Sequence, residues 1–197
     1  MLRVDPEQAM QQALAAGVRF FQYRDKTGTR KGLYETAFRL SRLSRDAQAC
    51  FIVNDHADIA LAVEADGVHL GQDDLPIEHA RKLVGKSRFI GISTHSLEQA
   101  TTAERDGADY IGFGPLFPTA TKDAGQVQGI RNLSIIKQSV AVPVIAIGGI
   151  TLETVREVIL NGADGVAVIS AILSTPDIRQ SAEQMFRIIT DSRRERT

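Results

Sequence analysis

The chain has 197 residues, which is enough for one well-buried domain and short for two, so we expect a single domain over residues 1–197. Its net charge of −1 excludes field-driven attraction to nucleic acid or to an anionic membrane, so any phosphate binding must come from a few placed groups. Because Cys50 is the only cysteine, an intrachain disulfide and a cysteine-based zinc site are excluded, and its apolar neighbours predict a packing role.

No apolar run approaches the roughly 18 residues that would indicate a membrane span. The N-terminal sequence MLRVDPEQAM lacks the charged and then apolar pattern of a signal peptide. We therefore expect a cytoplasmic protein that acts on small molecules, without nucleic-acid or membrane partners. The sequence does not determine whether the protein forms a homo-oligomer.

One pattern recurs along the chain: helical periodicity ends in glycine or an acidic residue, and a β-branched run follows. Gly17, Gly107 and Gly162 fit the ends of helices, where positive φ favours glycine. Asp5 and Pro6 predict a helix start, as do Ser96 and Thr151. In chain order, we expect strands over residues 2–4, 18–24, 50–54, 67–70, 88–93, 109–114, 143–148 and 165–170. The helices are expected over residues 6–16, 30–47, 57–64, 76–84, 96–106, 131–140, 151–161 and 177–191.

Eight alternating strands and helices allow either a (β/α)8 barrel or an open doubly wound sheet, both α/β folds. The open sheet usually has fewer strands at this length and a glycine-rich first turn, whereas the first turn here is VDPEQ. We therefore predict a (β/α)8 TIM barrel. Its first strand is short, because only MLRV precedes Asp5, and four residues span roughly 13 Å.

In such a barrel, functional residues lie at the carboxyl ends of the strands. The polar or glycine-rich residues at these ends are Gln22, Arg24, Lys26, Asn54, Asp55, the segment 71–74, Ser93, Thr94, His95, the segment 114–129, Gly148, Gly149 and Ser170. The strand interiors are apolar, so this concentration is typical of a binding site and is not needed by a scaffold alone.

Two groups of charges stand out among these residues. Arg24, Lys26 and Lys122 are cations that could converge on an anion. Asp55 and Asp74 follow neighbouring strands and could hold one Mg²⁺, which typically takes one or two carboxylates and leaves other positions for water and phosphates. Each aspartate could instead cap a helix, and the spacing does not choose between Asp73 and Asp74.

Glycine and hydroxyl residues indicate a second anion site. Gly148 and Gly149 would let backbone N–H groups approach a phosphate, with Ser170 after the last strand. The hydroxyls of Thr119 and Thr121 lie between the two sites. Among the histidines, only His95 is a candidate for catalysis, whereas His69 within a strand is expected in the core or behind a site residue.

These residues resemble the thiamine-phosphate synthase (thiamin phosphate pyrophosphorylase) family. The matching segments occur in family order over nearly the whole chain: FFQYRDK, FIVNDHADIALAVEADGVHLGQDDLP, GISTH, DYIGFGPLFPTATK, VIAIGGI and GADGVAVISAI. The resemblance implies a (β/α)8 barrel that joins a hydroxymethylpyrimidine diphosphate to a thiazole phosphate and releases diphosphate with the help of Mg²⁺.

The resemblance also assigns roles to residues. It implies that Asp55 and Asp74 ligate Mg²⁺. It implies that the pyrimidine diphosphate is contacted by Gln22, Tyr23, Arg24, Asp25, Lys26, Asn54, Ser93 and Lys122, of which Arg24, Lys26, Ser93 and Lys122 are expected to be catalytic. The thiazole phosphate would be held by Thr119, Ala120, Thr121, Gly149, Ile169 and Ser170.

The implied chemistry needs no enzyme nucleophile, because an electron-rich aminopyrimidine can stabilise a carbocation as diphosphate leaves. The segment 123–127 has no apolar period and is expected to be mobile without ligand and to close over the site.

Two alternatives stay open. One is a thiazole tautomerase-like isomerase on the same barrel, a branch that lacks the metal pair and has histidine in place of Pro115, and the other is a non-catalytic phosphate-binding barrel.

Overall fold

The computed structural model describes residues 4–119 and 126–196, and these residues form seven parallel strands. The strands are β1 (Phe20–Tyr23), β2 (Cys50–Asn54), β3 (Gly67–Leu70), β4 (Phe89–Thr94), β5 (Tyr110–Phe113), β6 (Val144–Ile147) and β7 (Gly165–Ala167). They pair in sequence order, each with the next, and every pair is parallel. This order follows from the alternation of strands and helices, because each crossover helix returns the chain to the neighbouring position.

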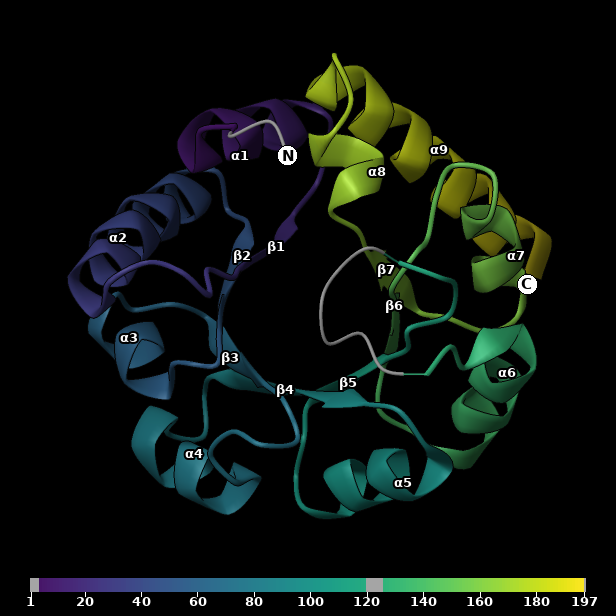
Figure 1. Ribbon diagram of the computed structural model, residues 1–197, viewed down its shortest axis with the longest axis horizontal. Helices are drawn as coiled ribbons and strands as arrows, with labels where there is room; N and C mark the ends of the chain where they lie inside the picture. The colour runs from purple at the N-terminus through teal and green to yellow at the C-terminus, as the bar shows by residue number, and fades with distance from the viewer. Residues whose placement is uncertain (1–3, 120–125, 197) are drawn as a thin grey trace.

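Helices surround the strands on the outside (Figure 1). They are α1 (Pro6–Ala15), α2 (Arg30–Asp46), α3 (Ala57–Ala62), α4 (Ile77–Val84), α5 (Leu97–Arg105), α6 (Gly129–Ser139), α7 (Val155–Leu160), α8 (Ser170–Leu173) and α9 (Ile178–Arg196). Within the described residues, no helix is both long and apolar enough to cross a membrane.

The sheet curls so that its two halves face each other (Figure 1). The ring of Phe20 on β1 meets the ring of Tyr110 on β5 edge to face, with centroids 5.7 Å apart, although three strands separate them in the sheet. No hydrogen-bonded ladder joins β7 back to β1 in the described part of the chain. The structure therefore shows a curled seven-stranded sheet rather than the eight strands that we expected. Of the expected first strand, residues 2 and 3 lie outside the described residues, and Val4 is not in a strand.

The predicted helix boundaries are mostly confirmed. The Asp5 carboxylate caps α1 by accepting from Gln8 N, with Pro6 at the first helical position. Gly17, Gly107 and Gly162 follow helices with φ of 94°, 97° and 108°, the region that favours glycine.

Three boundaries in the last part of the chain were predicted wrongly, one of them the helix expected to end at residue 191, which continues to Arg196. The last strand ends at Ala167, and Ser170 begins the short helix α8, because the chain turns there instead of extending the strand. The helix expected from Thr151 begins only at Val155, since Thr151 forms a turn in which its N–H donates to the Thr154 hydroxyl.

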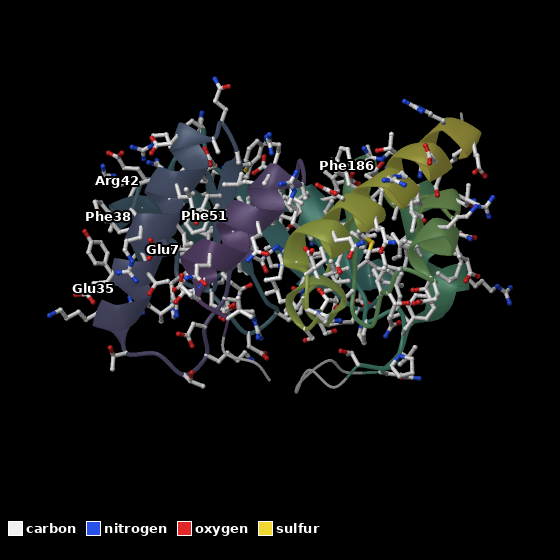
Figure 2. All side chains as sticks on the ribbon, turned by 90° about the horizontal axis from the view of Figure 1, so that it is seen from above. Glu7, Glu35, Phe38, Arg42, Phe51 and Phe186 are labelled. Atoms are coloured by element: carbon white, nitrogen blue, oxygen red, sulfur yellow. The ribbon has the colours of Figure 1, made fainter. Side chains whose placement is uncertain are left out.

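A single cluster of buried apolar side chains joins the strands to the inner faces of the helices. Phe51 in β2 is 1% exposed within it, whereas Phe38 and Arg42 lie on the outer surface of α2 (Figure 2). This inside-outside pattern matches α2's helical spacing of apolar residues, in which Leu33, Ala37 and Leu40 face the sheet.

Aspartates at the amino ends of β3, β5 and β7 tie neighbouring strands together in the same way. The carboxylate of Asp66 accepts from Phe51 N at 2.7 Å, that of Asp109 from Ile90 N at 2.7 Å, and that of Asp164 from Val144 N at 2.8 Å. The Ala-Asp pair before each of these strands is therefore a structural repeat, and it lies at the end of the sheet opposite the candidate site.

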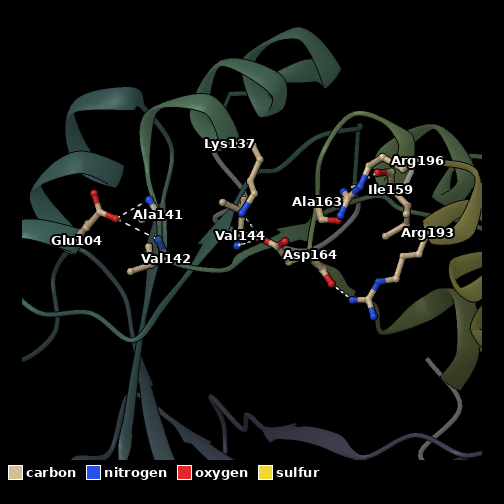
Figure 3. Close-up of polar contacts among 10 residues, drawn as sticks. All are labelled: Glu104, Lys137, Ala141, Val142, Val144, Ile159, Ala163, Asp164, Arg193 and Arg196. Carbon is tan, nitrogen blue, oxygen red and sulfur yellow. Dashed lines mark hydrogen bonds and ion pairs between the residues drawn. The ribbon is translucent and has the colours of Figure 1, made fainter.

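Asp164 is the most connected of the three (Figure 3). Its carboxylate also accepts from Lys137 Nζ at 2.7 Å, and its carbonyl accepts from the Arg193 guanidinium of α9. Arg196 of the same helix donates to the carbonyls of Ile159 and Ala163, both at 3.0 Å. The C-terminal helix is thus anchored at the amino ends of the last strands.

Asp164→Ala is expected to lower the free energy of unfolding by about 1.5–3 kcal/mol, the usual net value of hydrogen bonds to a charged group. The loss leaves Val144 N without its carboxylate acceptor. Urea denaturation would measure it, with Asp191→Ala as the control, because Asp191 is exposed and forms a long ion pair with Arg194 at 3.8 Å. Equal losses in the two variants would contradict the structural role of Asp164.

Candidate active site

The carboxyl ends of the strands form one rim of the curled sheet, and most of the predicted site residues lie on it. Asn54 at the end of β2 is in register with His69 on β3, and Asp55 N donates to the His69 carbonyl at 2.8 Å. The loops after β2 and β3 therefore start side by side, which brings together residues that are 19 positions apart in the chain.

Asp55 and Asp74 meet at this point, as the sequence suggested. The pKa of Asp55 is raised, first by burial and then by the hydrogen bond and negative charge of Asp74, while Arg24 acts in the opposite direction. Two carboxylates this close favour a shared proton or a cation between them. Asp74, the residue that the resemblance implies, is half-buried and interacts with Asp55, whereas Asp73 is exposed.

The backbone on both sides holds this pair in place. Asp55 has a φ of 64°, and the N–H of His56 donates to the Asn54 carbonyl at 2.8 Å across it, which forms a tight three-residue turn. Positive φ is uncommon outside glycine and costs conformational energy, so the surrounding contacts must hold the Asp55 backbone, and with it the carboxylate, in this conformation. Asn54 donates to the Asp55 carboxylate. Asp74 accepts from Gly71 N at 2.7 Å.

Arg24 and Lys26 follow β1 on the same rim, and both are exposed. The Arg24 guanidinium is close enough to lower the pKa values of Asp55 and His69, so it faces the carboxylate pair. Asp25 between the two cations has a clear local function: it accepts from Thr27 N at 2.8 Å and from Gly28 N at 3.0 Å. These bonds hold the pKa of Asp25 below its usual range and fix the loop that carries both cations. Tyr23 ends β1 in a half-buried position.

The loops after β5 and β6 are bound to each other. Leu116 N donates to the Ile147 carbonyl at 3.0 Å, and Phe117 N donates to the Gly148 carbonyl at 3.1 Å. A Cβ at Gly149, whose φ is 69°, would lie 2.6 Å from the Pro118 carbonyl oxygen, so only glycine fits. This close approach sets the half-buried Thr119 beside the glycine turn.

Ile169 and Ser170 lie at the start of α8 and are exposed. A short extra helix after the last strand is a common part of phosphate sites in barrels, and α8 has this position. Ala120, Thr121 and Lys122 lie outside the described residues, as does most of the expected lid, of which only Gln126 and Val127 are described.

A buried polar group lies beneath the rim, and it combines His69, which was expected in the core or behind a site residue, with Tyr110, which was not singled out from the sequence. His69 is 5% exposed, and its Nε2 lies 2.9 Å from Ser93 Oγ and its Nδ1 3.1 Å from the Tyr110 hydroxyl. Burial lowers the pKa of His69 to about 4, so the imidazole is neutral near pH 7. A tyrosine on the inward face of a strand needs a polar partner for its hydroxyl, which is the signal that could have pointed to Tyr110.

Two other predicted residues have structural roles. His95 Nδ1 lies 2.6 Å from the Gly114 carbonyl and so holds the loop after β5. Cys50 is half-buried, and burial raises the pKa of its thiol to about 12, which confirms the expected packing role.

Comparisons with known proteins agree on one family. Residues 3–172 match the sequence profile of the family described as thiamine monophosphate synthase. The chain is 47% identical over 190 residues to thiamine-phosphate synthase of Pyrococcus horikoshii, which covers 96% of this chain and 91% of the relative. It is 45% identical to thiamine-phosphate synthase of Shouchella clausii over 95% of the chain and 90% of the relative.

The solved structures agree as well. Thiamine phosphate pyrophosphorylase from Pyrococcus furiosus superposes with a TM-score of 0.90 and 42% identity, covering 95% of this chain and 91% of that one. A 3-hexulose-6-phosphate synthase from Salmonella typhimurium superposes with a TM-score of 0.74 over 94% of this chain and 92% of that one, but at 17% identity, so that likeness concerns the fold alone.

Proposed function

The chain belongs to the thiamine monophosphate synthase family, and we propose that the rim of strand ends described above carries out the reaction of that family. The activity is that of a transferase of thiamine biosynthesis. It joins 4-amino-2-methyl-5-(diphosphooxymethyl)pyrimidine to 4-methyl-5-(2-phosphooxyethyl)thiazole, forming a C–N bond and releasing diphosphate. The observation that carries the assignment to this rim is the meeting of Asp55 and Asp74 beside Arg24.

The carboxylate pair fits a divalent cation of the Mg²⁺ type. Hard oxygen ligands are what Mg²⁺ prefers, and it commonly uses only one or two carboxylates besides water and substrate phosphates. Within the described residues, no group of three or more His, Cys, Asp or Glu side chains could hold a metal, which agrees with such an open site. Asp55 and Asp74 would hold the ion, and when bound it would neutralise charge on the diphosphate.

The remaining residues divide between the two substrates. Arg24 and Lys26, with Lys122, would bind the diphosphate and stabilise the charge that develops as it leaves. Gln22, Asn54 and Ser93 would hold the pyrimidine. Tyr23 and Asp25 would contribute by shaping the loop that carries the cations.

The thiazole phosphate would bind at the joined loops, by Thr119, Gly149, Ile169 and Ser170 together with Ala120 and Thr121. Its charge is constant through the reaction, so this second site serves to place the thiazole nitrogen close to the reacting carbon. Closure of the segment 123–127 would keep water from capturing the carbocation first. No enzyme nucleophile takes part.

The proposal also includes a single domain over residues 1–197 and a cytoplasmic location. These rest on the alternating strand and helix pattern and on the resemblance of the whole chain to its family.

Diphosphate release, measured with and without the thiazole phosphate, tests the function. We expect release, and thiamine phosphate, to depend on both substrates and on Mg²⁺. Isomerisation of a thiazole substrate without diphosphate release would instead indicate a tautomerase. Binding of both phosphates with no product at all would indicate a non-catalytic barrel.

A further inference from the structure

Four polar side chains form a connected chain across the interior of the curled sheet, below the candidate site. Burial raises the pKa of Tyr110 on β5, and Gln22 on β1 lies close enough to its hydroxyl to act in the opposite direction. Tyr110 in turn contacts His69 on β3, and His69 contacts Ser93 on β4. The two ends of this chain, Gln22 and Ser93, are predicted substrate residues, whereas the two middle members are buried.

The sequence leaves space for this chain through two glycines. A Cβ at Gly91 would lie 2.1 Å from Tyr110 Cζ and 2.5 Å from His69 Nδ1, so no side chain fits there. A Cβ at Gly112 would lie 3.2 Å from His69 Cε1. Gly91 on β4 lies in register between His69 on β3 and Tyr110 on β5. Because Gly91 has no side chain, the two rings can contact each other across it. The close contacts at Gly91 and Gly112 therefore hold the imidazole ring in one orientation.

The Ser93 backbone is fixed independently of its hydroxyl. The Gln72 side chain donates to the Ser93 carbonyl at 2.7 Å, and Ser93 is in register with Gly112 on β5. With the backbone held, the direction of the Ser93 hydroxyl depends on its contact with His69 Nε2.

We propose that His69 is a positioning residue that sets the direction of the Ser93 hydroxyl, and that Tyr110 sets the orientation of the imidazole. A neutral imidazole has one donor and one acceptor nitrogen, so His69 donates a hydrogen bond at one nitrogen and accepts one at the other. A phenol is a stronger hydrogen-bond donor than an aliphatic hydroxyl, so in this arrangement the Tyr110 hydroxyl donates to Nδ1, and Nε2–H donates to the Ser93 oxygen. The Ser93 hydroxyl hydrogen is then available to an acceptor on the substrate. This role rests on the proposed function of Ser93.

Nitrogen NMR of protein with ¹⁵N-labelled histidine tests the geometry without an activity measurement. We expect one neutral tautomer of His69, protonated at Nε2, and a changed Nε2 shift in Ser93→Ala with Nδ1 unaffected. A charged imidazole, the Nδ1–H tautomer or an unchanged Nε2 shift would overturn the proposal.

Kinetics of paired variants test the consequence. The amide of His69→Gln can take the place of Nε2, whereas that of His69→Asn reaches only the place of Nδ1. We expect His69→Asn to lower kcat by about 10- to 100-fold, the loss typical when the outer partner of a ligand-contacting side chain is removed. His69→Gln should lie closer to wild type, the KM for thiazole phosphate should stay unchanged, and adding Ser93→Ala to His69→Asn should cost no more than Ser93→Ala alone.

The matched control is His79→Asn, because His79 is exposed on the outer helix α4 and is not among the predicted site residues. The proposal would be overturned if the kcat losses of His69→Asn and Ser93→Ala multiplied in the double variant. Equal kcat losses in His69→Asn and His69→Gln would also overturn it. Should His69→Asn fail to fold in a thermal melt, the NMR comparison of wild type and Ser93→Ala decides. Absence of product from wild type and His79→Asn would instead contradict the proposed function and leave the NMR test intact.

Discussion

Asp74→Asn is expected to reduce turnover by roughly 10²- to 10³-fold, by analogy with the loss of one preorganised electrostatic contact. The substitution keeps the shape of the side chain and removes one of the two charges that meet at the rim. Asp55 alone would then face the cation, so half-maximal activity should require a higher Mg²⁺ concentration. Steady-state rates over a Mg²⁺ titration would measure both effects.

Asp73→Asn is the matched control for this experiment. Asp73 precedes Asp74 in the same loop, yet it is exposed and does not contribute to the pKa shift of Asp55. We expect its Mg²⁺ dependence to be that of wild type. If Asp74→Asn kept full activity at limiting Mg²⁺, or if Asp73→Asn lost as much, the assignment of the metal pair would be wrong.

Arg24→Ala is expected to lower kcat and kcat/KM together, by about 10²- to 10³-fold, because a group that acts mainly on the departing diphosphate works in the transition state. Arg24→Lys should restore only part of the rate, since an ammonium cannot reproduce the planar fork of a guanidinium. The same expectation holds for Lys122→Ala. Initial rates with each substrate varied in turn would measure the effects.

Thr119→Val provides the contrast for Arg24. The thiazole phosphate keeps its charge through the reaction, so removing a hydroxyl that holds it should raise the KM for that substrate and leave kcat nearly unchanged. A rise in the thiazole phosphate KM alone in Arg24→Ala would move Arg24 to the second site and contradict the proposed division of the two anions.

Local chemistry was enough to predict most of the fold. The helix starts at Asp5 and Ser96 follow from side-chain oxygens that accept from exposed N–H groups, and the helix ends at Gly17 and Gly107 follow from positive φ. These effects depend on a few adjacent residues and can be found without tertiary contacts. The end of β7 could not be predicted in this way, because Val168 and Ile169 have the apolar, β-branched character of a strand but lead into α8.

The sequence by itself determined which residues line the rim, since in parallel strands with crossover helices the carboxyl ends meet at one edge. Gln22, Arg24, Asp55 and Ser93 were identified from that rule. The spacing alone left Asp73 and Asp74 open, the resemblance to the family implied Asp74, and the tertiary structure places that carboxylate beside Asp55. Only the tertiary structure joined His69 to Tyr110 and Ser93, because that chain depends on three neighbouring strands and on the space left at Gly91. Such contacts arise from register and side-chain packing between strands, which no local pattern along the chain encodes.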